Sequence, residues 1–288
     1  MINRSKTIKL NGWSLDARNP QVIENLMPFW GWFYQYYFRV QSDGWEHIPS
    51  QDPVLLVGSH NGGLAAPDMV MTMYDWFRNF GTQRPSYGLM HPHVWKMNSA
   101  IAQLAAQTGA IVAHPKMAIA ALESKASVLV YPGGAQDVFR PHRDRDKINL
   151  AGRTGFIKLA LKYHVPIIPI ISTGAHDTLI VLADFYEQAK QLHSLGMPWL
   201  LNLDPQVFPI YLGLPWGIAI GPLPNIPLPV PIRIRVCPPI WFEKYGKKAA
   251  GDRNYVKSCY ELVLTQMQQQ LNSLITETNP SYFCRSIF

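Results

Sequence analysis

The residue in this sequence best placed to do chemistry is a histidine that follows an apolar run. Residues 54–58 resemble the end of a buried strand, and His60 comes one serine later. Gly62 and Gly63 follow, and Asp68 stands eight residues after the histidine. A neutral imidazole can take a proton from an attacking hydroxyl, and a nearby carboxylate can fix its tautomer. We therefore predict that His60 is a general base and that Asp68 orients it.

The same segment supplies no hydrolase nucleophile. A Gly-x-Ser-x-Gly turn, which would expose a nucleophilic serine, does not occur in the sequence. Ser59 is adjacent to His60, and adjacent strand residues point to opposite faces. We expect a substrate hydroxyl, and not a protein serine, to attack. A purely structural role for His60, as a cap of the next helix, remains the alternative.

A second apolar run, residues 127–131, also ends in a glycine turn. Pro132, Gly133 and Gly134 follow it, and the free backbone N–H groups of such a turn can bind a phosphate or an oxyanion. Basic side chains then gather within fourteen residues: Arg140, His142, Arg143, Arg145, Lys147 and Arg153. Of these we expect Arg153, at the start of a helix, to face the site. A solvated basic loop is the alternative.

Strands that alternate with helices must position these residues. Continuous apolar runs predict strands at 53–58, 86–90, 127–131 and 165–172, and residues 108–112 are either strand or turn. Helices are expected over 67–80, 97–107, 115–125 and 152–163. This order predicts an α/β fold with a mostly parallel or mixed central sheet covered by helices on both faces. We expect a single domain, 1–288, with its catalytic core at 53–180 and a last helix over about 252–274.

Two segments outside this core are strongly apolar. Residues 22–40 contain eight aromatic side chains between positions 29 and 38. The uncharged stretch from Asn25 to Phe38 has fourteen residues, too few for a bilayer span of about 20 residues. A helix lying in the membrane interface and a helix packed on the protein are both open. No residue between Asp204 and Arg233 is charged, and eight prolines there rule out a continuous transmembrane helix. Over 204–240 we expect an apolar loop beside a pocket or against lipid, and then a strand.

Composition limits the partners and the compartment. Charged residues make up 16% of the chain against a usual share of about 25%, and the formal net charge is +7. An apolar, aromatic and basic chain favours a membrane surface over nucleic acid, because no basic tract interleaves with aromatic residues. The three separated cysteines indicate no disulfide framework and no metal site, so we expect a reducing compartment. Residues 1–11 do not have the pattern of a signal peptide.

The motifs together resemble the lysophospholipid acyltransferase superfamily, especially its branch of monoacylglycerol/diacylglycerol acyltransferases and phytyl ester synthases. The resemblance covers about 53–180 and rests on four segments, in matching order: 58–63 with Asp68, 131–137, Arg153 to Phe156, and 165–169. The family usually places four positions between its histidine and aspartate, whereas seven intervene here. Asp137 stands where the second motif usually has a glutamate.

This resemblance implies a glycerolipid-acyltransferase-like fold, with His60 as base and Asp68 as its orienter. It also implies that Gly133, Gly134 and Arg153 position the acyl donor or the acceptor head group. Gly62, Gly63, Asp137 and Arg140 complete the predicted substrate-binding set.

The expected reaction moves an acyl group from a thioester, acyl-CoA or acyl carrier protein, to a lipid hydroxyl without a metal or other cofactor. We expect a peripheral or monotopic protein on the cytoplasmic face of a membrane. A lipid esterase that uses water, and a lipid-binding protein without activity, are the alternatives.

Overall fold

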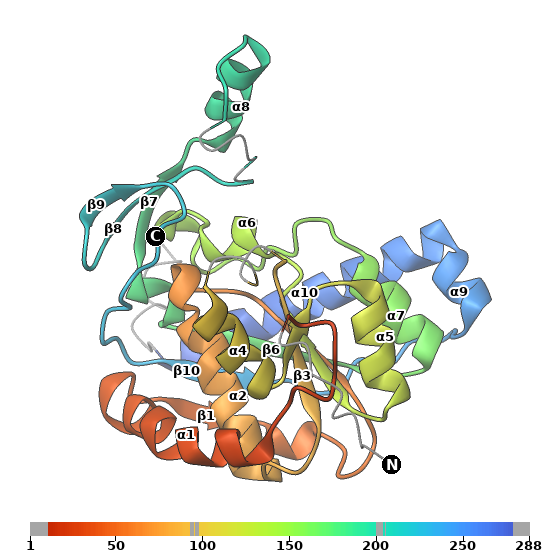
Figure 1. Cartoon of the computed structure of the whole chain (residues 1–288). Coiled ribbons are helices and arrows are strands. Elements are labelled where there is room, and N and C mark those ends of the chain that lie inside the picture. The colour runs from red at the N-terminus through yellow and green to blue at the C-terminus, as the bar shows by residue number, and fades with distance from the viewer. Residues whose placement is uncertain (1–10, 93–94, 96–97, 200–203, 205, 279–288) are drawn as a thin grey trace, which may run out of the picture.

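A seven-stranded sheet forms the centre of the computed structural model, which describes residues 11–92, 95, 98–199, 204 and 206–278. Its strands, in spatial order, are β1 (Gln41–Asp43), β10 (Arg233–Val236), β6 (Ile167–Thr173), β2 (Leu55–Gly58), β5 (Ser127–Val130), β3 (Ser86–Met90) and β4 (Ala110–Val112). The five strands from β6 to β4 are parallel, and β10 pairs with β6 in the antiparallel direction. The predicted α/β class with a mostly parallel sheet is confirmed (Figure 1).

Helices cover both faces of this sheet. The long helices are α1 (Pro20–Trp32), α2 (Pro67–Phe80), α4 (Ser99–Gln107), α5 (Pro115–Glu123), α7 (Gly155–Tyr163) and α10 (Arg253–Thr278). The short ones are η2 (Trp45–His47), η3 (Gly63–Ala65), α6 (Ala135–Val138), η4 (His142–Asp144), η5 (Ala175–Thr178) and α9 (Lys247–Gly251). α1 and α2 belong to the apolar core on one face, and α5, α7 and α10 belong to the core on the other.

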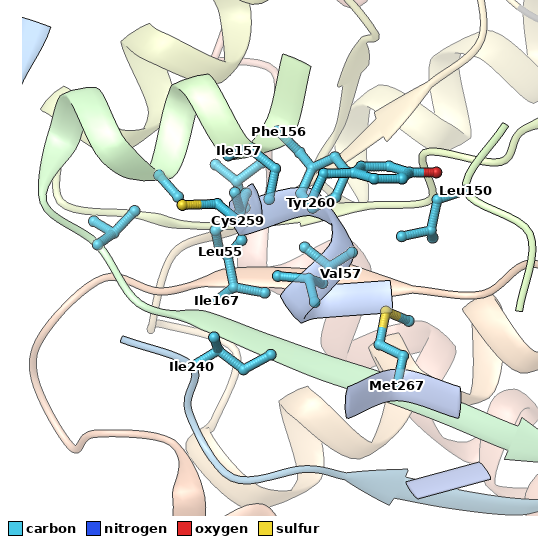
Figure 2. Packing of buried hydrophobic residues seen from close by; sticks show 14 of the residues in the cluster. Leu55, Val57, Leu150, Phe156, Ile157, Ile167, Ile240, Cys259, Tyr260 and Met267 are labelled. Atoms are coloured by element: carbon cyan, nitrogen blue, oxygen red, sulfur yellow. The ribbon is translucent and has the colours of Figure 1, made fainter. Parts of the chain in front are cut away.

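The central strand β2 is buried on both faces, so its sequence does not alternate between apolar and polar residues. Leu55 and Val57 point into the core formed with α7 and α10, where Ile157 and Met267 pack (Figure 2). Leu56 points to the opposite face, into the core with α1 and α2. Because successive side chains alternate, every residue of such a strand must be apolar. The strand is therefore a rigid support for whatever follows its carboxyl end.

The aromatic segment packs on the protein along one face and is exposed along the other. α1 ends at Trp32 and continues as a π-helical turn, η1 (Phe33–Tyr37). One face packs on the body, where Trp30 stacks on Phe77 and Tyr34 lies against Tyr74. The other face exposes an aromatic stripe at helical spacing, made of Phe29, Trp32 and Tyr36. Among the described residues, no helix has both the length and the apolarity needed to cross a membrane.

The expectation of a loop across the proline-rich segment is wrong. β8 (Pro209–Gly213) and β9 (Gly217–Ile220) form a hairpin there, and they join β7 (Ile180–Asp184) in a second, antiparallel sheet. The described prolines do not prevent the strands, because Pro209 begins β8, Pro215 lies in the turn, and the five from Pro222 to Pro231 follow the hairpin. The helix α8 (Tyr186–Ser194) projects beyond this sheet, away from the main body (Figure 1).

Most predicted boundaries agree with the structure within a few residues. The helix expected over 67–80 is α2 and the strand over 86–90 is β3. The helix expected from 152 begins at Gly155, and the last helix extends to Thr278. Position 97 of the predicted helix 97–107 lies outside the described residues, as do residues 1–10.

Candidate active site

The site lies at the carboxyl ends of three neighbouring strands. β2 lies between β6 and β5 in the sheet, and all three are parallel. His60 follows β2, Tyr131 follows β5, and Ser172 lies near the end of β6. In open α/β sheets this edge is where ligands bind. The topology thus brings together motifs that are about seventy residues apart in the sequence.

His60 faces Asp68 at the base of this edge. Its Nδ1 lies 3.6 Å from Asp68 Oδ1, and its side chain keeps 17% exposure while that of Asp68 has 3%. This distance suits an ion pair to a protonated imidazole but exceeds a hydrogen bond, and Nδ1 makes no hydrogen bond in the structure. Catalytic hydrogen bonds are often long before substrate binds. The Tyr131 ring lies beside the imidazole, with ring centroids 4.6 Å apart.

A short helical turn closes the long gap between His60 and Asp68. The backbone turns back through η3, with φ of +82° at Gly62, +69° at Gly63 and +43° at Ala66. Asp68 then falls in the first turn of α2, where its Oδ1 accepts the Met69 N–H at 2.8 Å. The seven intervening residues therefore add a turn without separating the two side chains.

Gly62 and Gly63, which the sequence predicts to contact substrate, are buried in protein contacts. A Cβ on Gly62 would lie 2.6 Å from Pro67 and from Thr178 Oγ1, and one on Gly63 would lie 2.5 Å from Leu179 Cδ2. Their missing side chains let the loop pack on η5 and the segment that follows it. We assign these glycines to loop packing.

Asp137 and Arg140 form a buried ion pair beneath the His60 loop. The Arg140 Nη1 lies 2.8 Å from Asp137 Oδ1, and the two residues are 5% and 0% exposed. Asp137 accepts the backbone N–H of His60 and the Ser59 hydroxyl. Burial raises the pKa of Asp137 to about 6, and the Arg140 guanidinium opposes this shift.

The remaining donors of Arg140 hold the backbone around the site. Nη1 also donates to His60 O at 2.9 Å, Nη2 donates to Asn61 Oδ1 at 2.5 Å and to Arg145 O, and Nε donates to Asp144 O. All five N–H groups are thereby used within the protein. Asp137 and Arg140 are predicted to bind substrate, and in the structure every polar side-chain atom of both is bonded within the protein. They position His60.

Gly133, Gly134 and Arg153 lie together on the neighbouring turn. Arg153 is exposed, and its Nη1 donates to Pro132 O at 2.8 Å. A Cβ on Gly134 would approach this Nη1 to 2.6 Å, and one on Gly133 would lie 2.0 Å from Asn149 O. The turn can hold the guanidinium against its backbone only because glycine occupies position 134. Arg153 is thus an exposed cation at the same sheet edge as the motif that follows β5.

Several residues of the site were missed by reasoning from the sequence. Asn61 connects Asp68 to the buried ion pair. Its Nδ2 lies 3.1 Å from both Asp68 Oδ2 and Ser172 Oγ, and its Oδ1 accepts from Arg140. Asn225 donates to Gly62 O and accepts the Ala65 N–H. Asn61 could have been noticed because it follows the histidine, and Asn225 because polar side chains are rare in its segment.

A buried histidine supports the same arrangement. His176 Nε2 donates to Arg140 O at 2.9 Å, and its Nδ1 has no partner. Burial lowers the pKa of His176 to about 3, and the nearby Arg140 guanidinium acts in the same direction. The imidazole is neutral at physiological pH and acts as a hydrogen-bond donor from η5 to the Arg140 backbone.

Residues 39–173 match the Acyltransferase family model. An uncharacterized protein of Mycobacterium tuberculosis is 26% identical over 267 residues, which are 92% of this chain and 69% of that protein. One of Mycobacterium leprae is 25% identical over 90% of this chain and 66% of its own length. The chain therefore spans about two thirds of these relatives.

A chloroplastic protein named phytyl ester synthase 2, from Arabidopsis thaliana, is 28% identical over 50% of this chain and 21% of its own length. Among solved structures, the 1-acyl-sn-glycerophosphate acyltransferase PlsC of Thermotoga maritima matches with a TM-score of 0.48 and 14% identity, over 86% of this chain and 79% of that one.

The matched segment and the phytyl ester synthase match support a relationship of this chain to the acyltransferase superfamily. This similarity supports lipid acyl transfer as the general class of activity.

Proposed function

We propose that this protein transfers an acyl group from a thioester, of CoA or of a carrier protein, to the hydroxyl of a lipid. The observation that carries the proposal is the position of His60, held at the end of the central strand with Nδ1 facing a buried carboxylate. A proton on Nδ1 stabilised by Asp68 leaves Nε2 as the base. Deprotonation of the lipid hydroxyl by Nε2 lets its oxygen attack the thioester carbonyl.

The hydroxyl nearest in sequence does not compete for this role. Ser59 is 3% exposed, and its Oγ donates to Asp137 at 3.2 Å. Its proton is therefore directed away from His60, which favours attack by a substrate hydroxyl over an acyl-serine intermediate.

In the proposed step, the new ester bond forms as the C–S bond of the tetrahedral intermediate breaks. The imidazolium returns its proton to the leaving thiolate, so that His60 is neutral again. A donor to the oxyanion is worth about 10²–10³ in rate. We assign that role to the glycine turn at Gly133 and Gly134, and we assign the anionic phosphopantetheine part of the donor to Arg153.

The lipid substrate implies a lipid surface, and we propose that the aromatic stripe of α1 and η1 lies at head-group depth. Phe29, Trp32 and Tyr36 are each more than half exposed. Aromatic side chains of this kind favour the interface between water and hydrocarbon. The protein is then peripheral or monotopic, on the cytoplasmic face.

The test is acyl transfer by purified His60→Gln with a labelled acyl-CoA and a panel of lipid acceptors. We expect a loss of about 10²–10⁴-fold in kcat, because general-base assistance has that magnitude. His114→Asn is the matched control, because the His114 side chain caps α5 and contacts the Trp13 ring, and asparagine caps a helix equally well. Transfer at the wild-type rate by His60→Gln would refute the mechanism, and free fatty acid as the sole product would indicate an esterase.

A further inference from the structure

The outer face of the second sheet is an aliphatic surface that no other described part of the chain covers. The inner face packs Val181, Tyr211 and Ala219 against α6. On the outer face Leu182, Leu212, Ile218 and Ile220 point outward, and Ile218 is 72% exposed. The register places Leu212 directly between Ile180 and Ile218, and Ile210 beside Ile220, so these side chains form adjacent cross-strand rows.

The surface continues past the hairpin turn. Trp216 in the turn is half exposed, and Leu214 pairs with Ile226, both also about half exposed. Leu223 is exposed on the same connecting segment. Soluble proteins rarely expose a contiguous apolar area of more than a few hundred Å² unless it binds something. We call residues 180–184 and 209–226 the hairpin face.

The hairpin face has almost no polar group available to a partner. Asp184 is the one charged residue of β7, β8 and β9, and it lies at the end away from the hairpin turn, where it caps backbone N–H groups. Tyr211 donates to Leu223 O, Trp216 Nε1 donates to Pro224 O at 2.7 Å, and the Asn225 side chain bonds the His60 loop. Each of these side chains is therefore satisfied within the protein.

This pattern favours hydrocarbon over a protein partner. Protein interfaces carry about one hydrogen bond per 100–200 Å² and a polar rim, which these side chains do not offer. Lipid chains form no hydrogen bonds and exclude unsatisfied polar groups. A surface whose polar side chains are all internally bonded meets that requirement.

The segment that follows the hairpin face is bonded to the end of the helix that carries the aromatic stripe. Tyr37 donates to Pro227 O at 2.8 Å and Arg39 donates to Pro229 O. Arg39 is exposed there and carries a positive charge suited to a lipid phosphate. Asn225, on the same segment, holds the loop that carries His60.

We propose that the hairpin face docks on the hydrocarbon of a lipid bilayer, with the aromatic stripe and Arg39 at the head-group level beside it. This inference rests on the proposed function and names the surface through which the site meets its lipid. Because Asn225 connects the face to the loop of Gly62 and Ala65, docking fixes the orientation of His60 relative to the bilayer.

The test is flotation of the purified chain with vesicles of pure phosphatidylcholine, using Ile218→Glu. We expect vesicle partitioning to fall about tenfold or more, because one exposed isoleucine leaves the hydrocarbon and a charge replaces it. Leu262→Glu, at an exposed leucine on α10, adds the same charge and is the control. Phosphatidylcholine has no net charge, so simple attraction by the basic chain cannot account for the result.

Equal partitioning of Ile218→Glu and wild type would overturn the proposal, and so would an equal loss in Leu262→Glu. A lipid-free dimer in sedimentation that Ile218→Glu dissociates would also overturn it, in favour of a second copy. Acyl transfer to a detergent-dispersed acceptor, measured on the same preparations, separates the two proposals. Retained transfer with lost flotation supports docking, whereas wild type that floats but transfers nothing refutes only the proposed function.

Discussion

Replacement of Arg140 by methionine tests whether the buried ion pair holds the site. The variant leaves the Asp137 carboxylate, which is 0% exposed, without its cation. Removal of one partner of a buried pair costs about 3–5 kcal/mol, a large part of a usual stability of about 5–15 kcal/mol. The lost hydrogen bonds to His60 O and Asn61 also free the histidine loop. We expect this loss of unfolding free energy in urea titrations, together with reduced acyl transfer.

The control and the second variant make this result specific. Arg143→Met lies in the same loop, but its side chain is 84% exposed and its ion pair with Asp144 is at the surface, so it should cost less than about 1 kcal/mol. Adding Asp137→Asn to Arg140→Met removes the uncompensated charge and should give a coupling energy of at least about 2 kcal/mol. A cost below about 1 kcal/mol for Arg140→Met, or additive effects in the double variant, would refute the reasoning.

Two other predictions concern supports of the site. Burial lowers the pKa of His176 to about 3, so the unfolded chain gains a proton as pH falls below about 6.5 while the folded chain does not, and stability is lost toward acid pH. His176→Gln should reduce the stability difference between pH 7 and pH 5 by on the order of 2 kcal/mol, and an unchanged pH profile of urea unfolding would contradict this. Asn225→Leu removes two hydrogen bonds to the His60 loop, so we expect acyl transfer to fall more than about tenfold with thermal unfolding little changed. With a detergent-dispersed acceptor, for which bilayer docking is not needed, Leu223→Ala on the same segment should keep full transfer, and an equal fall there would contradict the role of Asn225.

The sequence predicts the elements that have strong periodicity and their arrangement. β2, β5 and β6 are continuous apolar runs, and such runs occur where helices cover both faces of a parallel sheet. That alone brings the residues after β2 and β5 to one edge. The prediction of a loop over the proline-rich segment is wrong because it rests on proline content. Whether a strand can form depends instead on the position of each proline in it.

The roles of individual polar residues depend on burial, which residue type and spacing do not reveal. Arg140 and Arg153 are equally basic in the sequence, but one has every donor inside the protein and the other is exposed. The sequence alone likewise does not distinguish Gly63 from Gly134. One allows the loop to pack on Leu179, and the other allows an arginine to rest on the backbone. Only the tertiary contacts distinguish support of the site from contact with a ligand.

The distance between His60 and Asp68 depends on both sequence spacing and tertiary contacts. Three extra positions in a regular helix would carry the aspartate about 4.5 Å along the axis, yet the pair remains 3.6 Å apart because η3 accommodates the additional residues. That turn needs left-handed backbone at Gly62 and Gly63, the Asn225 amide to hold it, and Asn61 to join Asp68 to Arg140. The departure in spacing is therefore compensated by residues from three segments, which together keep the imidazole against its carboxylate.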